Sequence, residues 1–194
     1  MKILHLSQNY YPAFGGGIRY KKSFSEICRK KGFTVINLYN SKTKKVKHRD
    51  DIPSETTFLN RSITFSFEGI INFFKLVKNV DFIHLNYPSP QYDLLVIIAS
   101  ILYKRIPLLT IFYHADINKN VRFSRICNKF FLPFILKKAK YIFVSNPNIK
   151  KFSPYLSKIK NEEKIKILPF GVKNCPKVNS SIKCKSNIEC LGII

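Results

Sequence analysis

Short runs of apolar residues recur along this 194-residue chain, and segments with helical periodicity separate them. Each run is apolar at successive positions, which is typical of strands that helices cover on both faces of a parallel sheet. The sequence therefore predicts an α/β fold: a single Rossmann-like, open, mostly parallel sheet with helices on both faces. The expected strands are Ile3–Leu6, Val35–Leu38, Phe82–Leu85, Leu108–Phe112, Tyr141–Val144 and Ile165–Leu168, and the expected helices are Ile18–Lys31, Glu68–Lys78, Tyr92–Tyr103, Asn120–Lys138 and Asn148–Ile159.

Two segments fall outside this alternation. Ser41–Thr57 is polar and basic, and we expect it to form a mobile loop. From residue 173 the chain turns polar and linker-like before a last apolar segment begins. We therefore expect one domain at 1–172, followed at 173–194 by a linker and the first strand of a further domain. Gly32 is expected to end the first helix, and Pro147 to lie in the first turn of the last one.

The chain is strongly basic, with 34 Lys and Arg against 11 Asp and Glu and a formal net charge of +23. This charge favours an anionic partner such as phosphate, a lipid headgroup or nucleic acid. A compositional bias that merely solvates the surface with lysine explains it equally well.

The five cysteines form no C-x-x-C pair and have no histidine at metal-binding spacing, so we expect reduced thiols and no metal site. The first apolar run is too short for a signal peptide, and Leu94–Leu102 is too short to cross a bilayer. These features predict a cytoplasmic protein, with peripheral contact at the inner membrane face as an option.

Three glycines, Gly15, Gly16 and Gly17, lie between the first strand and the first helix. Glycines at such a turn let backbone N–H groups approach a phosphate, and the helix amino terminus adds partial positive charge. The spacing matches neither G-x-G-x-x-G nor a P-loop. A flexible turn that needs positive φ is the alternative interpretation.

His114 and Asp116 follow the strand Leu108–Phe112, at the carboxyl edge where open α/β sheets form their ligand crevice. His114 could hydrogen-bond a hydroxyl or phosphate, and Asp116 could orient it or accept from a sugar hydroxyl. We expect the glycine turn and His114 to meet at this edge.

Other polar residues near strand ends are weaker candidates. Tyr87 precedes a proline-rich loop that could line an acceptor pocket, and Ser145 follows a strand where helix capping alone would explain it. His84 lies inside an apolar run and is interpreted as structural, whereas His48 is interpreted as solvated.

Two helical segments, Phe67–Lys78 and Phe123–Lys140, combine aromatic residues with lysines. Either could lie on an anionic membrane surface, with aromatic side chains inserted and lysines at the rim. The alternative, which we prefer for most of these residues, is a helix that covers the sheet and has a basic exposed edge.

Eight segments also follow one another in an order that a known family shares. In chain order they are Met1–Leu6, Tyr10–Pro12, Gly15–Ile18, Lys30–Val35, Asp81–Leu85, Thr110–Asp116, Ala139–Ser145 and, closing the pattern, Ile167–Val172. This order resembles the amino-terminal domain of retaining, GT-B-fold glycosyltransferases of family 4, with its Y-P-P, G-G-I, R-G-H-E-V, T-x-H-x-D and I-P-N-G-V-D motifs. The resemblance covers residues 1–172.

The resemblance implies an acceptor-side domain for transfer of a sugar from a nucleotide-sugar to a glycan or lipid-linked acceptor, without a metal and with the nucleotide-sugar as co-substrate. Gly16 and Gly17 would approach donor phosphates or acceptor, and His114 with Asp116 would contact the reacting groups. Phe170 stands where the family usually has Asn, and Lys173 where it often has Asp.

The family's second domain supplies an Arg, a Lys and an E-x7-E stretch for the donor, and this chain lacks them. We therefore expect the chain alone to be inactive and to need a separate donor-binding domain. One alternative is a truncated, non-catalytic remnant or binding module. Another is a basic nucleic-acid-binding protein, which the absence of a nucleic-acid-binding motif disfavours.

Overall fold

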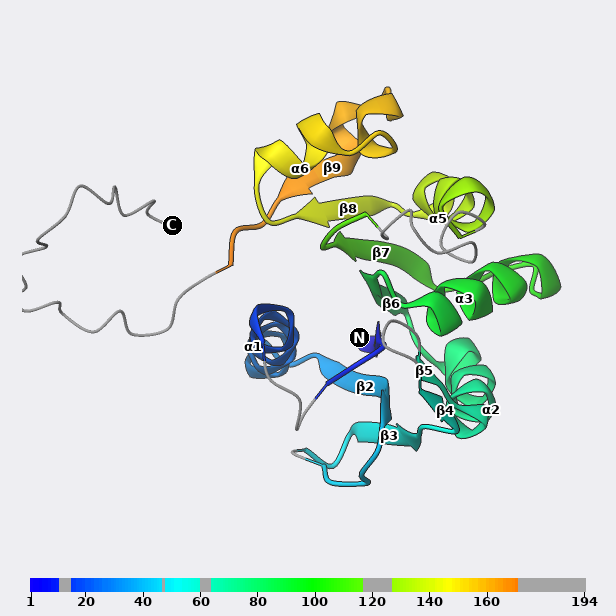
Figure 1. Cartoon of the computed structure of the whole chain (residues 1–194). Coiled ribbons are helices and arrows are strands. Elements are labelled where there is room, and N and C mark those ends of the chain that lie inside the picture. The colour runs from blue at the N-terminus through cyan, green and yellow to red at the C-terminus, as the bar shows by residue number, and fades with distance from the viewer. Residues whose placement is uncertain (11–14, 47, 60–63, 117–126, 171–194) are drawn as a thin grey trace, which may run out of the picture.

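In the computed structural model, the chain is described at residues 1–10, 15–46, 48–59, 64–116 and 127–170. Its centre is a sheet of seven parallel strands (Figure 1). The strands lie in the order β3 (Asp51–Glu55), β2 (Thr34–Ser41), β1 (Lys2–Ser7), β6 (Phe82–Tyr87), β7 (Leu108–Tyr113), β8 (Tyr141–Val144) and β9 (Ile165–Ile167).

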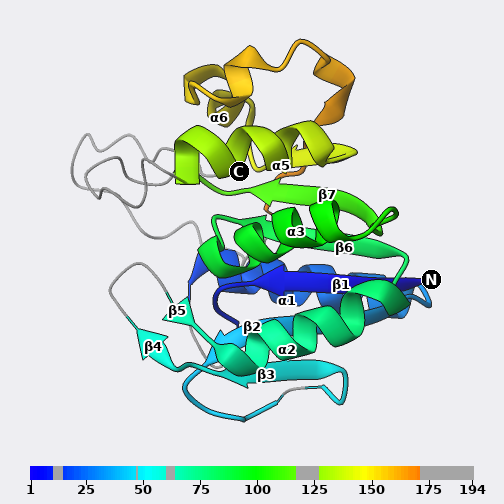
Figure 2. The same ribbon diagram turned by 90° about the vertical axis from the view of Figure 1, so that its right-hand side faces the viewer.

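Helices cover both faces of this sheet, as the two views show (Figures 1 and 2). One face carries α1 (Gly16–Lys30), and the opposite face carries α2 (Phe67–Leu76), α3 (Pro90–Leu102) and α5 (Leu132–Lys138). Near β8 lie α6 (Pro147–Phe152) and the short 3₁₀ turns η3 (Leu156–Lys158) and η4 (Glu162–Lys164). The predicted fold class, a Rossmann-like open parallel sheet with helices on both faces, is confirmed.

The segment predicted to be a mobile loop, Ser41–Thr57, instead contains the edge strand β3. Apolar residues do not mark this strand, because Asp51 and Ser54 fill its buried positions. Pro53 is tolerated there because an edge strand needs to donate hydrogen bonds on one side only. A two-stranded antiparallel ribbon, β4 (Phe58–Leu59) with β5 (Thr64–Phe65), follows it.

Helix ends agree with the sequence in two places and differ in two others. Gly32, at φ +83°, follows the end of α1, and Pro147 begins α6 as predicted. The helix predicted at Asn148–Ile159 is shorter, because Ser153 adopts the extended conformation that a following proline requires. The helix predicted at Asn120–Lys138 is a π turn, η2 (Cys127–Phe131), leading into α5, and residues 120–126 lie outside the described part.

The two faces of the sheet differ in chemistry. The face under α2, α3 and α5 packs a core of leucine, isoleucine and tyrosine side chains. The face under α1 instead carries a row of polar residues at matched register positions, one from each of five neighbouring strands. This polar row consists of Asp51, Asn37, His5, His84 and Thr110.

Candidate functional site at the carboxyl edge of the sheet

After β1 the chain adds β2 and β3 on one side of it and then β6 to β9 on the other side. The switch point of the sheet therefore lies between β1 and β6. In open α/β sheets the crevice outside the carboxyl ends of such strands is where ligands bind. The amino terminus of α1 and the residues that follow β7 lie at this edge (Figure 1). The predicted glycine turn and His114 therefore belong to the part of the fold where a ligand is expected.

The glycine turn shapes the start of α1. Gly15 precedes the helix with φ +136°, a conformation that favours glycine over residues with side chains. The first amide of α1 that bonds within the turn is that of Arg19, which donates to the Gly15 carbonyl at 3.0 Å. The earlier amides, at Gly16 and Gly17, lie at the positive end of the helix dipole, where an anion is stabilised.

His114 lies directly beside this turn. A Cβ atom placed on Gly17 would be 3.8 Å from Cε1 of His114, which is van der Waals contact, whereas one on Gly16 would meet nothing within 4 Å. His114 also packs against the rings of Tyr20, Phe112 and Phe170, with centroid distances of 5.8, 4.7 and 6.1 Å. The structure thus brings the glycine turn and His114 together at one edge.

The side chain that hydrogen-bonds His114 is Asn86 rather than Asp116. Nε2 of His114 is 3.3 Å from Oδ1 of Asn86, at the end of β6. Asp116 instead accepts hydrogen bonds from Ser153, at 2.9 Å, and from the hydroxyl of Tyr113. The carboxylate predicted to orient His114 is therefore engaged with the last residue of β7 and with the residue that follows α6.

Asn86 connects His114 to the polar row. Nδ2 of Asn86 donates to Nε2 of His5 at 2.5 Å, and Nδ1 of His5 is 2.7 Å from Oδ1 of Asn37. Nδ2 of Asn37 donates in turn to Oδ1 of Asp51 at 2.6 Å. A continuous path of side-chain hydrogen bonds therefore runs from Asp51, on the edge strand, to His114.

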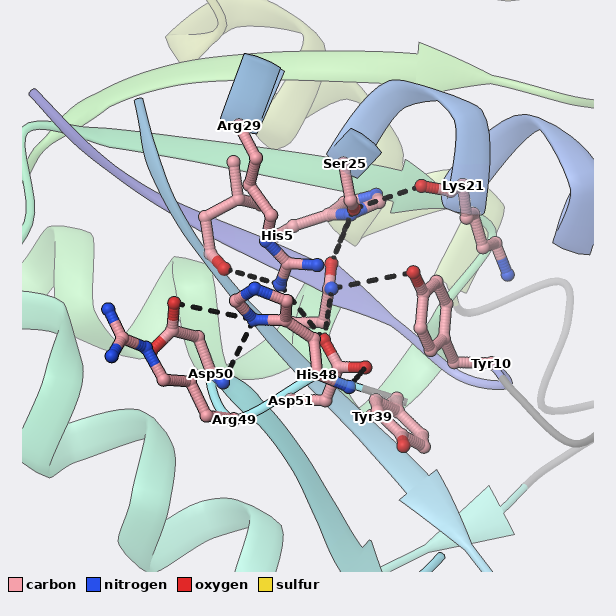
Figure 3. A network of polar contacts seen from close by, with 12 residues as sticks. His5, Tyr10, Lys21, Ser25, Arg29, Tyr39, His48, Arg49, Asp50 and Asp51 are labelled. Atoms are coloured by element: carbon pink, nitrogen blue, oxygen red, sulfur yellow. Dashed lines mark hydrogen bonds and ion pairs between the residues drawn. The ribbon is translucent and has the colours of Figure 1, made fainter. Parts of the chain in front are cut away.

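The Asp51 end of this path is held by positive charge. Arg29, reaching down from α1, donates to Oδ1 of Asp51 at 3.0 Å, and the amide of His48 donates to Oδ2 at 3.1 Å (Figure 3). The side chain of Asp51 is 1% exposed. The carboxylate of Asp51 thus accepts hydrogen bonds from Arg29, from the amide of His48 and from Asn37.

Burial keeps the histidines of this region uncharged. Burial, followed by the charge of Lys21, lowers the pKa of His114 to about 4, and burial lowers the pKa of His5 to about 3. Burial also holds the pKa of His84 well below its usual value. At neutral pH, His114 is a neutral hydrogen-bonding group and provides no cationic clamp.

Lys21 is a residue of this edge that sequence reasoning missed. It is 8% exposed, donates to the Asn9 carbonyl at 2.8 Å, and burial lowers its pKa to about 8. Lys21 lies one helical turn before Ser25, whose hydroxyl is 2.8 Å from Oδ1 of Asn37, so it shares the face of α1 that covers the polar row. Periodicity alone treats a lysine in such a helix as a solvated residue.

The remaining predicted residues lie farther from this group. The ring of Tyr87 is 1% exposed and stacks on Tyr113 at 5.0 Å, so in this conformation it offers no surface to a ligand. Ser145 is half-buried after β8, and the residue that caps α6 is Asn146, whose Oδ1 accepts from the Ile149 amide at 3.2 Å. His84 is buried, as predicted, and His48 is partly exposed.

Neither a metal cluster nor a membrane-spanning helix is found among the described residues. No group of three or more His, Cys, Asp or Glu side chains in that part of the chain could hold a metal ion. Likewise, none of its helices is both long and apolar enough to span a bilayer.

Comparison with solved structures defines the class of fold. The chain resembles an α-glucosyltransferase in complex with UDP-glucose and DNA containing an abasic site, with TM-score 0.54, 13% identity, and coverage of 87% of this chain and 42% of that one. It also resembles a UDP-N-acetylglucosamine 2-epimerase, with TM-score 0.53, 11% identity, and coverage of 86% and 47%. The chain thus has the Rossmann-like α/β fold of about half of a GT-B-like protein, a fold that a transferase and an epimerase share.

Among characterised sequences, the chain is similar to the O-antigen chain mannosyltransferase C of Escherichia coli. The two are 27% identical over 178 residues, which is 89% of this chain and 46% of the mannosyltransferase. This chain therefore spans less than half the length of that relative. No protein-family model matches it.

Proposed function

We propose that this chain forms the acceptor side of the cleft of a retaining, metal-independent glycosyltransferase of family 4, which moves a sugar from a nucleotide-sugar to a glycan or lipid-linked acceptor. The observation that carries the proposal is the close approach of Gly17, at the start of α1, to His114, at the switch point of a parallel sheet. The similarity to a mannosyltransferase supports it.

The two halves of this edge have different chemistry. The amides at the start of α1 favour an anion, such as a donor phosphate, while the neutral ring of His114 favours a hydroxyl. A sugar phosphate or a glycan hydroxyl near a diphosphate presents both groups at neighbouring positions. The edge therefore fits a sugar-transfer reaction better than the binding of a simple anion.

Turnover requires a donor-binding domain that residues 1–172 do not contain. We expect 173–194 to lead toward such a domain, and we expect the 194-residue chain by itself to be inactive. Without the second domain, the leaving diphosphate would lack cationic groups to stabilise its developing charge.

A binding experiment tests the acceptor side directly. Isotope-labelled chain is titrated with lipid-linked glycan fragments and with UDP-glucose and GDP-mannose, and backbone amide signals are followed by NMR. We expect saturable shifts at Gly16, Gly17 and His114, and their loss in His114→Ala. Shifts confined to other parts of the sheet, or none with any ligand of the set, would overturn the assignment.

A transfer experiment tests the reaction. The chain is mixed with the part of the E. coli mannosyltransferase that it does not match, and transfer from labelled nucleotide-sugars is measured. Transfer that needs both proteins and disappears with His114→Ala supports the proposal. Persistent inactivity despite a demonstrated complex and acceptor binding indicates a non-catalytic binding module.

The net charge of +23 favours a second candidate, in which the bound polyanion is nucleic acid. An α-glucosyltransferase with a related fold is itself described in complex with DNA. Binding to a DNA duplex that weakens steeply with salt and competes with the glycan at His114 would identify DNA as the acceptor. Binding that is unaffected by His114→Ala would reflect surface charge.

A further inference from the structure

The hydrogen bonds that link Asp51 to His114 have only one consistent direction. Nδ2 of Asn37 donates to Oδ1 of Asp51, so the amide oxygen of Asn37 faces His5. His5 then carries its proton on Nδ1 and accepts at Nε2 from the N–H of Asn86. Oδ1 of Asn86 is left to accept from Nε2–H of His114.

We propose that Asp51, through Asn37, His5 and Asn86, fixes the tautomer of His114 with its proton on Nε2 and its lone pair on Nδ1. These four residues are positioning residues, which act through His114. The inference depends on the proposed function only where it names the group of the substrate that His114 contacts. A lone pair on Nδ1 accepts a hydrogen bond from a hydroxyl and repels a phosphate oxygen. His114 therefore selects a sugar hydroxyl, and the amides of α1 take the anion.

Burial explains why this direction is strict. The four positioning residues are each at most 5% exposed. Water therefore cannot readily hydrogen-bond a donor or acceptor that faces the wrong way. Reversing one amide would place two donors or two acceptors face to face at 2.5 to 2.7 Å. Leaving buried polar groups unpaired costs about 1–3 kcal/mol each, enough to suppress the reversed arrangement.

The test reads tautomers by NMR in the full chain with no substrate present, so sugar transfer can fail while this inference stands. Long-range ¹⁵N–¹H spectra of histidine-labelled chain at neutral pH should show His5 protonated on Nδ1 and His114 on Nε2. With Asn86→Leu, His114 should lose its preference while His5 keeps its own. With Asp51→Asn, which can donate as well as accept, both should lose it.

The difference between the two variants distinguishes residues that fix the histidine tautomers from residues that only stabilise the fold. A variant that unfolds shows no native histidine signals, and the unaltered chain still decides the question. His114 protonated on Nδ1 in the unaltered chain, or unchanged in both folded variants, would overturn the inference.

A second inference arises from the opposite end of the sheet and does not depend on sugar transfer. A cavity of about 480 Å³ lies between η2 and α5 on one side and the turns η3 and η4 on the other. Its lining is half lysine and half uncharged, and none of the described lining residues is acidic. The residues are Lys129, Lys137, Lys158, Lys164, Pro133, Leu136, Tyr155 and Ile159, and we name this site the α5 pocket.

Within the described part of the chain, no carboxylate forms an ion pair with a lysine of the α5 pocket. Nζ of Lys164 donates to the Lys137 carbonyl at 2.9 Å, and burial lowers its pKa. Glu162, on the same turn, is paired with Lys150 outside the pocket at 2.7 Å. The lining of the pocket therefore combines positive charge with apolar side chains, which fits a phosphate group attached to an apolar body.

Exposed aromatic side chains on η2 and α6 favour a lipid over a free anion. Phe130 is 60% exposed beside Lys129, whose Nζ is 5.4 Å from its ring centroid. Phe152, at the end of α6, is 74% exposed, with Nζ of Lys151 at 5.6 Å. Exposed phenylalanines rimmed by lysines are suited to the headgroup region of an anionic bilayer.

We propose that the α5 pocket binds the phosphate headgroup of an anionic phospholipid, with Phe130 and Phe152 entering the interface. The test is sedimentation of the full chain with phosphatidylcholine vesicles that contain none or about 30 mol% phosphatidylglycerol, at about 0.1 M salt. Binding should require phosphatidylglycerol and weaken about ten-fold in a Lys129→Glu, Lys158→Glu double variant.

The control variant changes net charge by the same amount elsewhere. Lys30→Glu with Lys75→Glu, at exposed positions of α1 and α2, should change vesicle binding by less than about three-fold. Equal loss in both double variants would show diffuse charge and overturn the proposal. So would equally tight binding of inorganic phosphate or glycerol phosphate, or pocket-dependent binding that prefers a DNA duplex to vesicles.

Discussion

Lowering the pH from 7 to 5 should destabilise this protein through three buried histidines. His5, His84 and His114 all have pKa values below 6.5 in the folded chain, with His5 at about 3 and His114 at about 4. The unfolded chain binds these protons as the pH falls below about 6.5, and the folded chain does not. Stability is therefore lost on acidification through this window.

One buried carboxylate acts in the opposite direction. Asp93, at the start of α3, has a pKa raised to about 7 by burial. In the folded chain this carboxyl is protonated as the pH falls below about 7, whereas in the unfolded chain it is protonated only near pH 3.9. Acidification therefore adds stability at this residue, and the two effects partly cancel.

The net effect follows from these values. From pH 7 to pH 5, His5 and His114 each remove about 1.9 kcal/mol and Asp93 returns about 2.3 kcal/mol, while His84 acts in the same direction as the other two histidines. The unfolding free energy should therefore fall by at least about 1.5 kcal/mol, a measurable part of the ~5–15 kcal/mol typical of a domain. Near pH 5.5 the slope corresponds to at least about one proton, or roughly 1.4 kcal/mol per pH unit.

Urea unfolding followed by circular dichroism at several pH values measures this slope. His5→Gln should make it shallower by about one proton, and Asp93→Asn should make it steeper by about one. A flat unfolding free energy between pH 7 and 5 would show that the histidines titrate normally, and the account of the polar row would then be wrong.

Two further predictions concern glycines. Gly17→Leu should cover His114 and slow its modification by diethyl pyrocarbonate several-fold, as measured by mass spectrometry. Gly16→Leu, where a Cβ meets nothing within 4 Å, should not slow the modification. Equal modification rates in the two variants would refute the close approach of Gly17 to His114. Gly69→Ala should lower the unfolding free energy by about 1–3 kcal/mol, because the added Cβ would lie 3.0 Å from the buried hydroxyl of Tyr92. An unchanged urea midpoint would contradict this packing.

The sequence alone predicted the strands of the sheet whose buried side chains are apolar. Six strands and the α1 boundary at Gly32 were predicted, because leucine and isoleucine runs mark the core and glycine marks a helix end. The strand β3 was missed because its buried positions are held by pairing with β2 and by the Asp51–Arg29 ion pair. Such stabilisation has no hydrophobic period to detect.

The candidate site was only partly accessible from the sequence. His114 and the glycine turn follow from their places at strand ends, and chain order predicted that they share an edge. The partner Asn86 was not predicted, since a hydrogen bond between β6 and β7 depends on register that one sequence does not reveal. Tyr87 shows the reverse error, because a strand-end tyrosine can face inward as readily as outward.

The polar row has a consequence for how the sheet assembles. Leu4 and Leu6 flank His5 and point to the opposite face, so sliding β1 by one residue would exchange leucine for histidine on both faces at once. The imidazole would then enter a hydrocarbon core without a partner, and leucine would displace it from its two asparagines. Misaligned sheets are thereby excluded during folding, and the arrangement that survives is the one that connects the far edge of the protein to His114.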